Sequence, residues 1–239
     1  MNRENFVKLI EQTEGLISTQ EAMFLRTMAK RSTSTIVEIG SWKGKSTIAL
    51  GLGSKAGNRQ TVIAIDSHEG DLSYHEWELE KNSSTTGQIF LENITNAGIK
   101  DLVWPLFVKS DQASGLVEDG IGFLFIDGDH RYEGVKKDFE LYSPKVSVGG
   151  IIAFHDTFSW EGAIGVVDNI VFPSEKWLCM GFVGSITYFK KVQKLTLKEK
   201  IGNFLILLVR KVFVFVIFLH LPKWLLKPLK KIATKILEG

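Results

Sequence analysis

Residues 35–47 constrain the fold of this chain more than any other stretch. Three of the four residues 36–39 are β-branched and apolar, a pattern that predicts a buried strand. Gly40 and Gly44 follow, and glycine allows both a tight turn and a close approach of the backbone to a ligand. Residues 46–50 then begin a helix whose first N–H groups point back at the turn. The stretch therefore predicts a strand, a loop and a helix start that together cradle a nucleotide-containing ligand.

The rest of the chain repeats this alternation of apolar strands and helices. One or two amphipathic helices are expected within residues 3–30, with Ser18 as an N-cap, and a hairpin is expected to turn at Gly184. Strands that alternate with helices predict an α/β fold, here a doubly wound, mostly parallel, Rossmann-like sheet of seven strands that ends in an antiparallel hairpin. The expected strands are 36–39, 61–66, 103–108, 121–126, 151–154, 177–183 and 185–190.

A glycine or a polar residue stands at or just beyond the end of each expected parallel strand. These residues are Gly40, Asp66, Ser110, Asp127 and Asp156. In a doubly wound sheet the carboxyl ends of the parallel strands share one edge, and ligands bind beyond that edge. We therefore expect these five residues to line one binding site.

The spacing of the glycine loop indicates which ligand it holds. A dinucleotide fingerprint requires G-x-G-x-x-G, whereas Gly40 and Gly44 are four positions apart and Glu38 precedes them. A carboxylate repels a pyrophosphate and attracts a cation, so Glu38 suits the ammonium group of an amino-acid ligand. S-adenosylmethionine carries an ammonium, a sulfonium and a ribose but no phosphate, and Asp66 stands where a nucleotide-binding unit places the acid that holds ribose hydroxyls. These residues favour S-adenosylmethionine, and a dinucleotide-dependent oxidoreductase is the alternative.

Four segments of residues 33–192 resemble the class I S-adenosylmethionine-dependent methyltransferases. Within that class they are similar to the metal-dependent O-methyltransferases that act on sugars of macrolide antibiotics and related glycans, the macrocin O-methyltransferase-like enzymes. The segments are 37–47, 65–71, 125–132 and 149–156. The resemblance divides the chain into an N-terminal helical cover (1–32), a methyltransferase domain (33–192) and a C-terminal tail (193–239).

The resemblance implies a role in cofactor binding for each matching residue. The residues expected around the methionine part of S-adenosylmethionine are Glu38, Gly40, Ser41, Gly44 and Ser46. Asp66 is expected to hold the ribose hydroxyls, and Ser110 and Asp111 are expected to contact the adenine.

The resemblance also implies a divalent metal ion bound by Asp127 and Asp156, and His155 beside them is a further candidate ligand. Mg²⁺ prefers oxygen ligands, which the two aspartates supply. The sugar-modifying relatives commonly carry a glutamate at the position of His155, and an imidazole favours a softer ion such as Mn²⁺. The sequence leaves open whether the ion is Mg²⁺ or Mn²⁺. It also leaves open whether His155 is a ligand or supports the ligands from behind.

Methyl transfer to a sugar hydroxyl requires removal of a proton and in-line alignment of oxygen, methyl carbon and sulfur. His130, three residues after Asp127, is the expected general base because the ordinary pKa of histidine lies near neutral pH. A metal ion held by Asp127 and Asp156 would lower the pKa of the hydroxyl. We therefore predict catalytic roles for these three residues. The alternative for His130 is a structural role at the start of a helix.

The segment 67–88 is long for a plain connection between a strand and a helix. It contains His68 and His75 among other polar and aromatic residues, which is compatible with a lid or a substrate-binding loop. A surface helix with solvated charges is the alternative of equal weight.

The C-terminal residues 193–239 differ in charge from the rest of the chain. They contain ten lysines and arginines and two glutamates, a net charge of +8, so residues 1–192 carry −6 of the overall +2. Residues 201–221 are very apolar, although Arg210 and Lys211 interrupt them, and residues 223–232 are basic and amphipathic. We expect residues 201–235 to lie on an anionic membrane surface. An oligomer or partner interface and a membrane span are the alternatives.

Charge and composition narrow the class of function. The acidic body argues against a nucleic-acid-binding domain, which needs a basic face. The chain starts without an apolar signal segment and has Cys179 as its single cysteine, which favours a cytoplasmic protein at the inner face of the membrane. The sequence therefore predicts an O-methyltransferase that acts on a sugar hydroxyl of a small or lipid-linked acceptor. A non-catalytic, membrane-tethered partner protein with the same fold is a further alternative.

Overall fold

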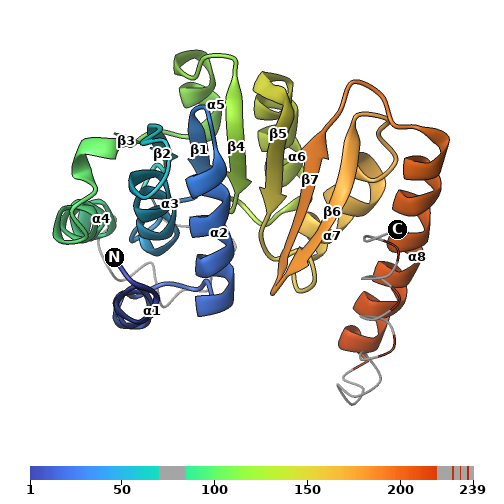
Figure 1. The fold of residues 1–239 in the computed structure, drawn as a ribbon, viewed down its shortest axis with the longest axis horizontal. Helices are drawn as coiled ribbons and strands as arrows, with labels where there is room; N and C mark the ends of the chain where they lie inside the picture. Colours follow the sequence, from blue (N-terminus) through green and yellow to red (C-terminus); the bar gives the residue numbers. More distant parts are fainter. Residues whose placement is uncertain (70–83, 220–227, 229–231, 233–235, 237–239) are drawn as a thin grey trace.

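A central sheet of seven strands organises the protein (Figure 1). The computed structural model describes residues 1–69 and 84–219, together with residues 228, 232 and 236. The strands are β1 (Ile36–Ile39), β2 (Val62–Ile65), β3 (Val103–Leu106), β4 (Ile121–Ile126), β5 (Val146–Phe154), β6 (Trp177–Val183) and β7 (Ile186–Lys191). Their order in the sheet is β3-β2-β1-β4-β5-β7-β6. The first five strands are parallel, and β7 pairs antiparallel with both β5 and β6. The expected doubly wound sheet with a terminal hairpin is confirmed.

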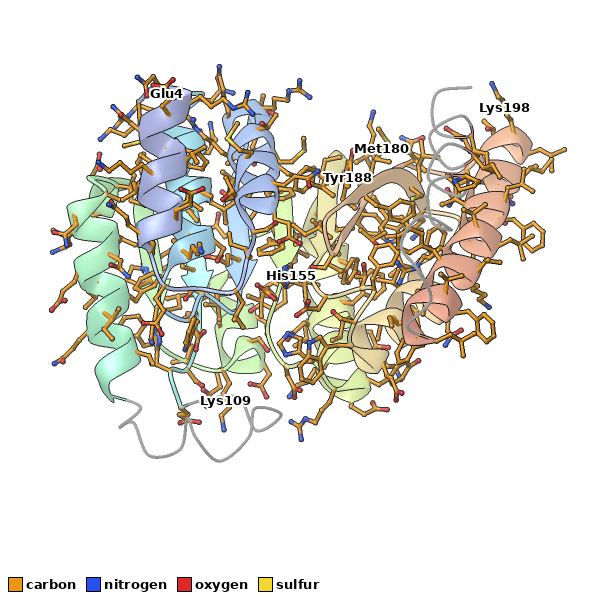
Figure 2. The ribbon with its side chains drawn as sticks, turned by 90° about the horizontal axis from the view of Figure 1, so that it is seen from below. Glu4, Lys109, His155, Met180, Tyr188 and Lys198 are labelled. Atoms are coloured by element: carbon orange, nitrogen blue, oxygen red, sulfur yellow. The ribbon has the colours of Figure 1, made fainter. Side chains whose placement is uncertain are left out.

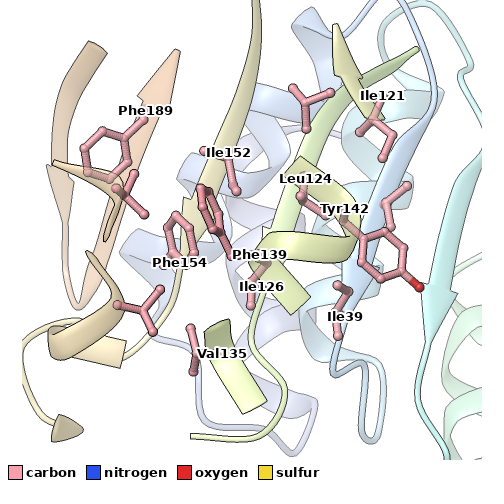
Figure 3. Packing of buried hydrophobic residues seen from close by; sticks show 14 of the residues in the cluster. Ile39, Ile121, Leu124, Ile126, Val135, Phe139, Tyr142, Ile152, Phe154 and Phe189 are labelled. Atoms are coloured by element: carbon pink, nitrogen blue, oxygen red, sulfur yellow. The ribbon is translucent and has the colours of Figure 1, made fainter. Parts of the chain in front are cut away.

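Helices cover both faces of the sheet and enclose two hydrophobic cores. One face carries α1 (Arg3–Gln12), α2 (Thr19–Arg31), α3 (Lys45–Lys55) and α4 (Ser84–Asn96), and the other carries α5 (Ser110–Ala113), α6 (Tyr132–Tyr142) and α7 (Glu161–Val166). Single-turn helices η1 (Lys100–Leu102), η2 (Ser114–Leu116) and η3 (Ser143–Lys145) precede or follow strands, and a π-helical turn, η4 (Val167–Val171), extends α7. Because side chains alternate along a strand, Ile36 and Val37 enter opposite cores. Figure 3 shows the core under α6, with Phe139 against Phe154.

Two parts of the fold depart from the expected boundaries. Strand β5 begins five residues earlier than expected and passes through Gly149 and Gly150, with a register shift opposite Ile121. A Cβ at Gly150 would lie 2.9 Å from the Ile121 carbonyl oxygen, so glycine allows this close approach of β5 to β4. The segment 67–88, for which a lid and a surface helix were both open, is described only at residues 67–69 and from Ser84, where α4 begins, and the rest lies outside the described residues.

The chain continues into α8 (Leu197–Phe218), which lies at the end of the sheet beside β6 (Figure 1). The buried Asn203 side chain accepts a hydrogen bond from the Cys179 backbone N–H and donates one to the Trp177 carbonyl oxygen. These bonds join α8 to β6, so the first part of the predicted tail packs on the methyltransferase domain. Among the residues that the structure describes, no helix combines the length and apolar character needed to cross a bilayer.

Candidate active site

The glycine loop between β1 and α3 packs directly against the end of β4. Gly40 has a φ of +85°, and a Cβ there would lie 2.0 Å from the Asp127 carbonyl oxygen. Gly44, with a φ of +86°, is the N-cap of α3, and its N–H donates to the Ser41 carbonyl oxygen at 2.7 Å. Both glycines therefore adopt a left-handed conformation that costs other residues free energy. The close contact at Gly40 brings the loop next to the predicted catalytic aspartate.

Glu38 lies below this loop and is fully buried. Its Oε2 accepts a hydrogen bond from Thr47 Oγ1 at 2.5 Å, whereas its Oε1 has no hydrogen-bond partner among the described residues. Burial raises the pKa of Glu38 to about 8, hydrogen bonds oppose the shift, and the charges of Asp127 and Asp66 add to it. Ser41, also buried, likewise has an unpaired hydroxyl. Such unpaired buried oxygens suit a ligand with N–H donors, such as an amino acid ammonium group.

Asp66 follows β2 and fixes two neighbouring loops. Its Oδ2 accepts the Trp42 N–H at 2.7 Å, and its Oδ1 accepts the His68 N–H at 2.7 Å. Trp42 and His68 both have positive φ angles, of 40° and 55°, so this carboxylate stabilises two unusual backbone conformations. The ring of His68 packs between Phe90 and Phe107, and burial lowers its pKa. His68 is therefore a buried residue beneath the site; His75 lies outside the described residues.

The two residues expected at the adenine point in different directions. Ser110 is partly buried, and its Oγ donates to Asp138 Oδ1 at 2.5 Å. Burial raises the pKa of Asp138 to about 6. Asp111 is exposed and forms an ion pair with Lys137 on α6 at 2.6 Å, which lowers the pKa of Asp111. Ser110 is thus tied to Asp138 of α6, and Asp111 pairs with Lys137 at the surface of the same helix.

Asp127, His130 and Asp156 converge at the carboxyl edge of the sheet. Their ligand atoms lie within 4.8 Å of one another, in an arrangement that could hold a metal ion. His130 Nε2 is 3.1 Å from Asp156 Oδ2 and 3.9 Å from Asp127 Oδ1. The His130 ring stacks on Trp160, with centroids 4.8 Å apart. The structure therefore brings together the three residues expected to be catalytic.

His155 is buried and lies in the interior of the molecule (Figure 2), and it faces the same two aspartates. Its Nδ1 is 3.0 Å from Asp127 Oδ1 and 3.3 Å from Asp156 Oδ2, and its Nε2 is 3.5 Å from Glu21 Oε1. Burial alone would lower the pKa of His155, but these three carboxylates raise it well above its usual value. Among the described residues, the group that could hold a metal contains His130 instead of the expected His155. His155 is placed to orient both aspartates from behind.

Glu21 is a residue of this site for which the sequence predicted no role. Its Oε2 forms a capping box with the expected N-cap, Ser18, by accepting hydrogen bonds from the Ser18 N–H and hydroxyl, both at 2.7 Å. Its Oε1 accepts from the N–H and hydroxyl of Ser185, at 2.7 and 2.8 Å, and faces His155. Burial would raise the pKa of Glu21, but these partners lower it to about 2. One carboxylate thus ties α2 to the β6–β7 turn and to the site.

Asp156 adopts a strained conformation, with a φ of +54°. Burial would raise the pKa of its carboxyl group, but His130 and His155 hold that pKa below its ordinary range. The next residue, Thr157, is fixed by a hydrogen bond from its N–H to the Ser185 carbonyl oxygen at 3.0 Å. The carboxylate therefore stays charged and is held in place at neutral pH.

An open pocket of about 660 Å³ extends from this cluster. His130, Tyr132 and Trp160 contribute aromatic side chains to its lining, Arg131 and Glu161 contribute polar groups, and Phe218 at the end of α8 also lines it. A pocket that combines aromatic faces with hydrogen-bonding groups suits a polar, ring-shaped molecule.

Comparison with known proteins places this geometry in context. The profile of a family described as a methyltransferase domain matches residues 37–157. The uncharacterized protein R132 of Acanthamoeba polyphaga mimivirus is 29% identical over 124 residues, which cover 51% of each chain, so this chain spans about half the length of that curated relative. The O-methyltransferase NovP is similar in structure, with a TM-score of 0.62, 20% identity and coverage of 74% of this chain and 81% of NovP. The O-methyltransferase TomG from Streptomyces achromogenes, solved with S-adenosylmethionine, has a TM-score of 0.57, 11% identity and coverage of 80% and 89%.

Proposed function

Because this chain belongs to the methyltransferase domain family and has the class I fold, we propose that it transfers a methyl group from S-adenosylmethionine to a sugar hydroxyl. The observation that carries the proposal is the cluster of Asp127, His130 and Asp156, which touches the glycine loop through the contact of Gly40 with Asp127. A proton acceptor and a cofactor cradle therefore lie side by side at one edge of the sheet.

The residues around the glycine loop fit S-adenosylmethionine. The unpaired Oε1 of Glu38 and hydroxyl of Ser41 offer buried acceptors to the ammonium group, and Gly40 and Gly44 let the backbone approach the methionine part. Asp66 lies at the end of β2, in position to accept ribose hydroxyls. TomG, with its bound S-adenosylmethionine, has the same fold, which supports this choice of cofactor.

For methyl transfer to a hydroxyl, the main chemical group that the protein must supply is a base. The sulfonium of S-adenosylmethionine supplies an activated methyl group, so the protein must align the acceptor oxygen and remove its proton. The imidazole of His130 can take that proton on the ring nitrogen that does not face Asp156. Its Nε2 stays 3.1 Å from Asp156 Oδ2, and the charged Asp156 stabilises the imidazolium that results. Stacking on Trp160 holds the imidazole ring in place while it does so.

Two carboxylates and an imidazole are also a donor set that fits a divalent cation, and Asp127, His130 and Asp156 would hold it. A cation there would lower the pKa of a coordinated acceptor hydroxyl. His155 and Glu21 would then keep both aspartates oriented from the buried side. The mixed oxygen and nitrogen donors favour Mn²⁺ over Mg²⁺.

The pocket beside His130 supports a sugar as acceptor. Trp160 and Tyr132 offer aromatic faces on which a sugar ring can pack, and the neighbouring Arg131 and Glu161 can bond its hydroxyls. The acceptor is then a glycan, a glycolipid or a glycosylated metabolite. The name O-methyltransferase given to NovP and TomG supports oxygen as the atom that is methylated.

Binding and product analysis test the proposal together. In calorimetry, S-adenosylhomocysteine is expected to bind the full chain, whereas NAD is expected not to bind. Labelled S-adenosylmethionine is then incubated with nucleotide sugars and extracted glycolipids, with and without EDTA, and the product is expected to be a methyl ether. Binding of NAD instead would favour an oxidoreductase. Cofactor binding without methyl transfer to any acceptor would favour a non-catalytic partner protein, and a methylated nitrogen would exclude the hydroxyl chemistry.

A further inference from the structure

Helix α8 has the opposite polarity to an ordinary surface helix. Its outer face consists of large apolar side chains that are 42–62% exposed: Ile201, Phe204, Leu205, Leu208, Val212 and Phe215. Its inner face carries the buried polar side chains of Asn203 and Arg210. Figure 2 shows α8 as the outermost helix beyond the hairpin, with Lys198 near its first turn and side chains that project away from the sheet.

The inner face fixes which way the helix is turned. Arg210 is 1% exposed, and its Nε donates to Asp168 Oδ1 on η4 at 2.6 Å. The same guanidinium bonds the Thr157 carbonyl oxygen and the Thr187 hydroxyl, and it lies over the ring of Phe158 with 4.4 Å to the centroid. Rotating the helix so that its outer face turned inward would break these bonds. It would also separate Arg210 from Asp168 and leave Asp168 buried without its partner, which costs much free energy. The apolar outer face is therefore a fixed feature of the surface.

A contiguous apolar surface of this kind marks a site of interaction. The charges around it indicate what it meets. Lys198 and Lys211 are exposed, and at 100° per residue Lys211 lies about 70° from the centre of the outer face, at its margin. The sequence that follows, residues 220–239, adds five lysines and a single glutamate. Apolar side chains flanked by lysines are complementary to a bilayer that carries anionic headgroups.

We propose that the outer face of α8 binds the surface of an anionic lipid bilayer, with its axis parallel to the membrane plane. The aromatic and aliphatic side chains enter the boundary between headgroups and acyl chains, and Lys198 and Lys211 reach the phosphates. Phe218 lies at the end of this helix and also lines the pocket beside His130. The pocket therefore opens beside the lipid surface. The binding itself requires no turnover, so it stands or falls independently of the proposed function.

Vesicle co-sedimentation of the full chain tests the proposal. The protein is mixed with vesicles of phosphatidylcholine alone and with vesicles in which about a third of the lipid is phosphatidylglycerol. We expect binding to the anionic vesicles to be roughly tenfold or more tighter, and to weaken as salt is added. Equal partition onto both vesicles, or no sedimentation with either, would overturn the proposal.

Matched double variants assign the binding to α8. Phe204→Ser with Phe215→Ser is expected to reduce binding at least tenfold, because both rings would lose their burial in lipid. The control, Leu116→Ser with Val148→Ser, changes two side chains that are 54% and 61% exposed elsewhere, and is expected to bind as the unchanged protein does. Lys211→Glu keeps the apolar face and is expected to reduce the preference for anionic vesicles, since Lys198 and the lysines of residues 220–239 remain. Circular dichroism confirms that each variant is folded.

The outcomes separate a membrane from other occupants of this face. A dimer seen by light scattering without lipid, which the double variant on α8 dissociates, would assign the outer face to a second copy and overturn the proposal. Unchanged sedimentation of that double variant would do the same. Loss of binding in both double variants would show that the apolar face of α8 is not the specific site.

Discussion

Two of the places where the described residues bury charged groups differ in how completely those groups are satisfied. Between α8 and η4, the cation of Arg210 pairs with the anion of Asp168. The Arg210 guanidinium also donates hydrogen bonds to Thr157 and Thr187. At the carboxyl edge of the sheet, by contrast, several carboxylates crowd around imidazoles, and Glu38 keeps an unpaired oxygen. A satisfied pair serves the fold, whereas an unsatisfied cluster is held by the fold for a ligand.

This comparison makes opposite predictions for substitutions in the two regions. A change in the cluster at the carboxyl edge should reduce methyl transfer while the protein stays folded. A change in the Arg210 pair should instead reduce the free energy of unfolding.

The largest effect is expected at Asp127, where Asp127→Asn should lower the rate of methyl transfer roughly 10²–10⁴-fold. The substitution removes the charge that faces His155 and His130 and that could bind a cation. Asp101→Asn is the matched control, since Asp101 lies before β3, at the opposite edge of the sheet from the cluster, and pairs with the exposed Arg59. Initial rates with labelled cofactor measure the difference. Equal rates for the two variants would refute the role given to the cluster.

Arg210→Met should lower the free energy of unfolding by about 3–5 kcal/mol, because it leaves Asp168 buried without its partner. Adding Asp168→Leu should restore most of that loss, since a buried ion pair can be replaced by apolar side chains at little net cost. Urea denaturation of the two variants measures both changes. A double variant as unstable as the single one would mean that the hydrogen bonds of Arg210 to Thr157 and Thr187 matter more than its charge.

The sequence predicted the site where local pattern and topology act together. A run of β-branched residues that ends in glycine or aspartate predicts a strand and the position of its end. In a parallel sheet these ends lie along one edge. Gly40, Asp127 and Asp156 therefore came together as expected, although their strands lie far apart in the chain. His130 follows Asp127 by three residues, so its place near the cluster was also local information.

The remaining contacts depend on tertiary packing, which leaves no local signal. Ser18 was predicted as an N-cap, but nothing local indicated that Glu21 Oε1 would face Ser185 in the β6–β7 turn and His155 just after β5. Arg210 appears in the sequence as a charge that interrupts an apolar run, and nothing near it indicates Asp168 as its partner. The helical periodicity of α8 likewise cannot tell which of its faces meets the sheet.

The comparison is sharpened by pH, because the pKa of buried Glu38 is raised to about 8 from an ordinary 4.5. The folded state then binds a proton that the unfolded state releases as pH rises above 4.5. The stability contributed by neutral Glu38 is fully present below pH 4.5 and is lost as pH rises towards 8. Glu38→Gln should therefore raise the free energy of unfolding at pH 8 by a few kcal/mol and flatten its pH dependence. Thermal unfolding from pH 5 to pH 8 tests this, and an unchanged slope would contradict it.

The smallest expected effect is the release of the Glu38 proton when a ligand with an ammonium group binds. At pH 7 Glu38 is largely protonated in the free protein, and an ammonium group placed beside it would lower its pKa. Binding of S-adenosylhomocysteine should then release up to about one proton. The affinity should therefore increase as pH rises towards 8, by at most about tenfold per pH unit. Calorimetry in phosphate and in Tris reveals the proton, because the two buffers differ in their enthalpy of ionisation. Glu38→Gln should bind more weakly and with the same heat in both buffers. If the unchanged protein also gives equal heats in the two buffers, the unpaired oxygen of Glu38 does not face the ammonium group of the ligand. Glu38 would then not differ from the Arg210 pair in having a role in binding.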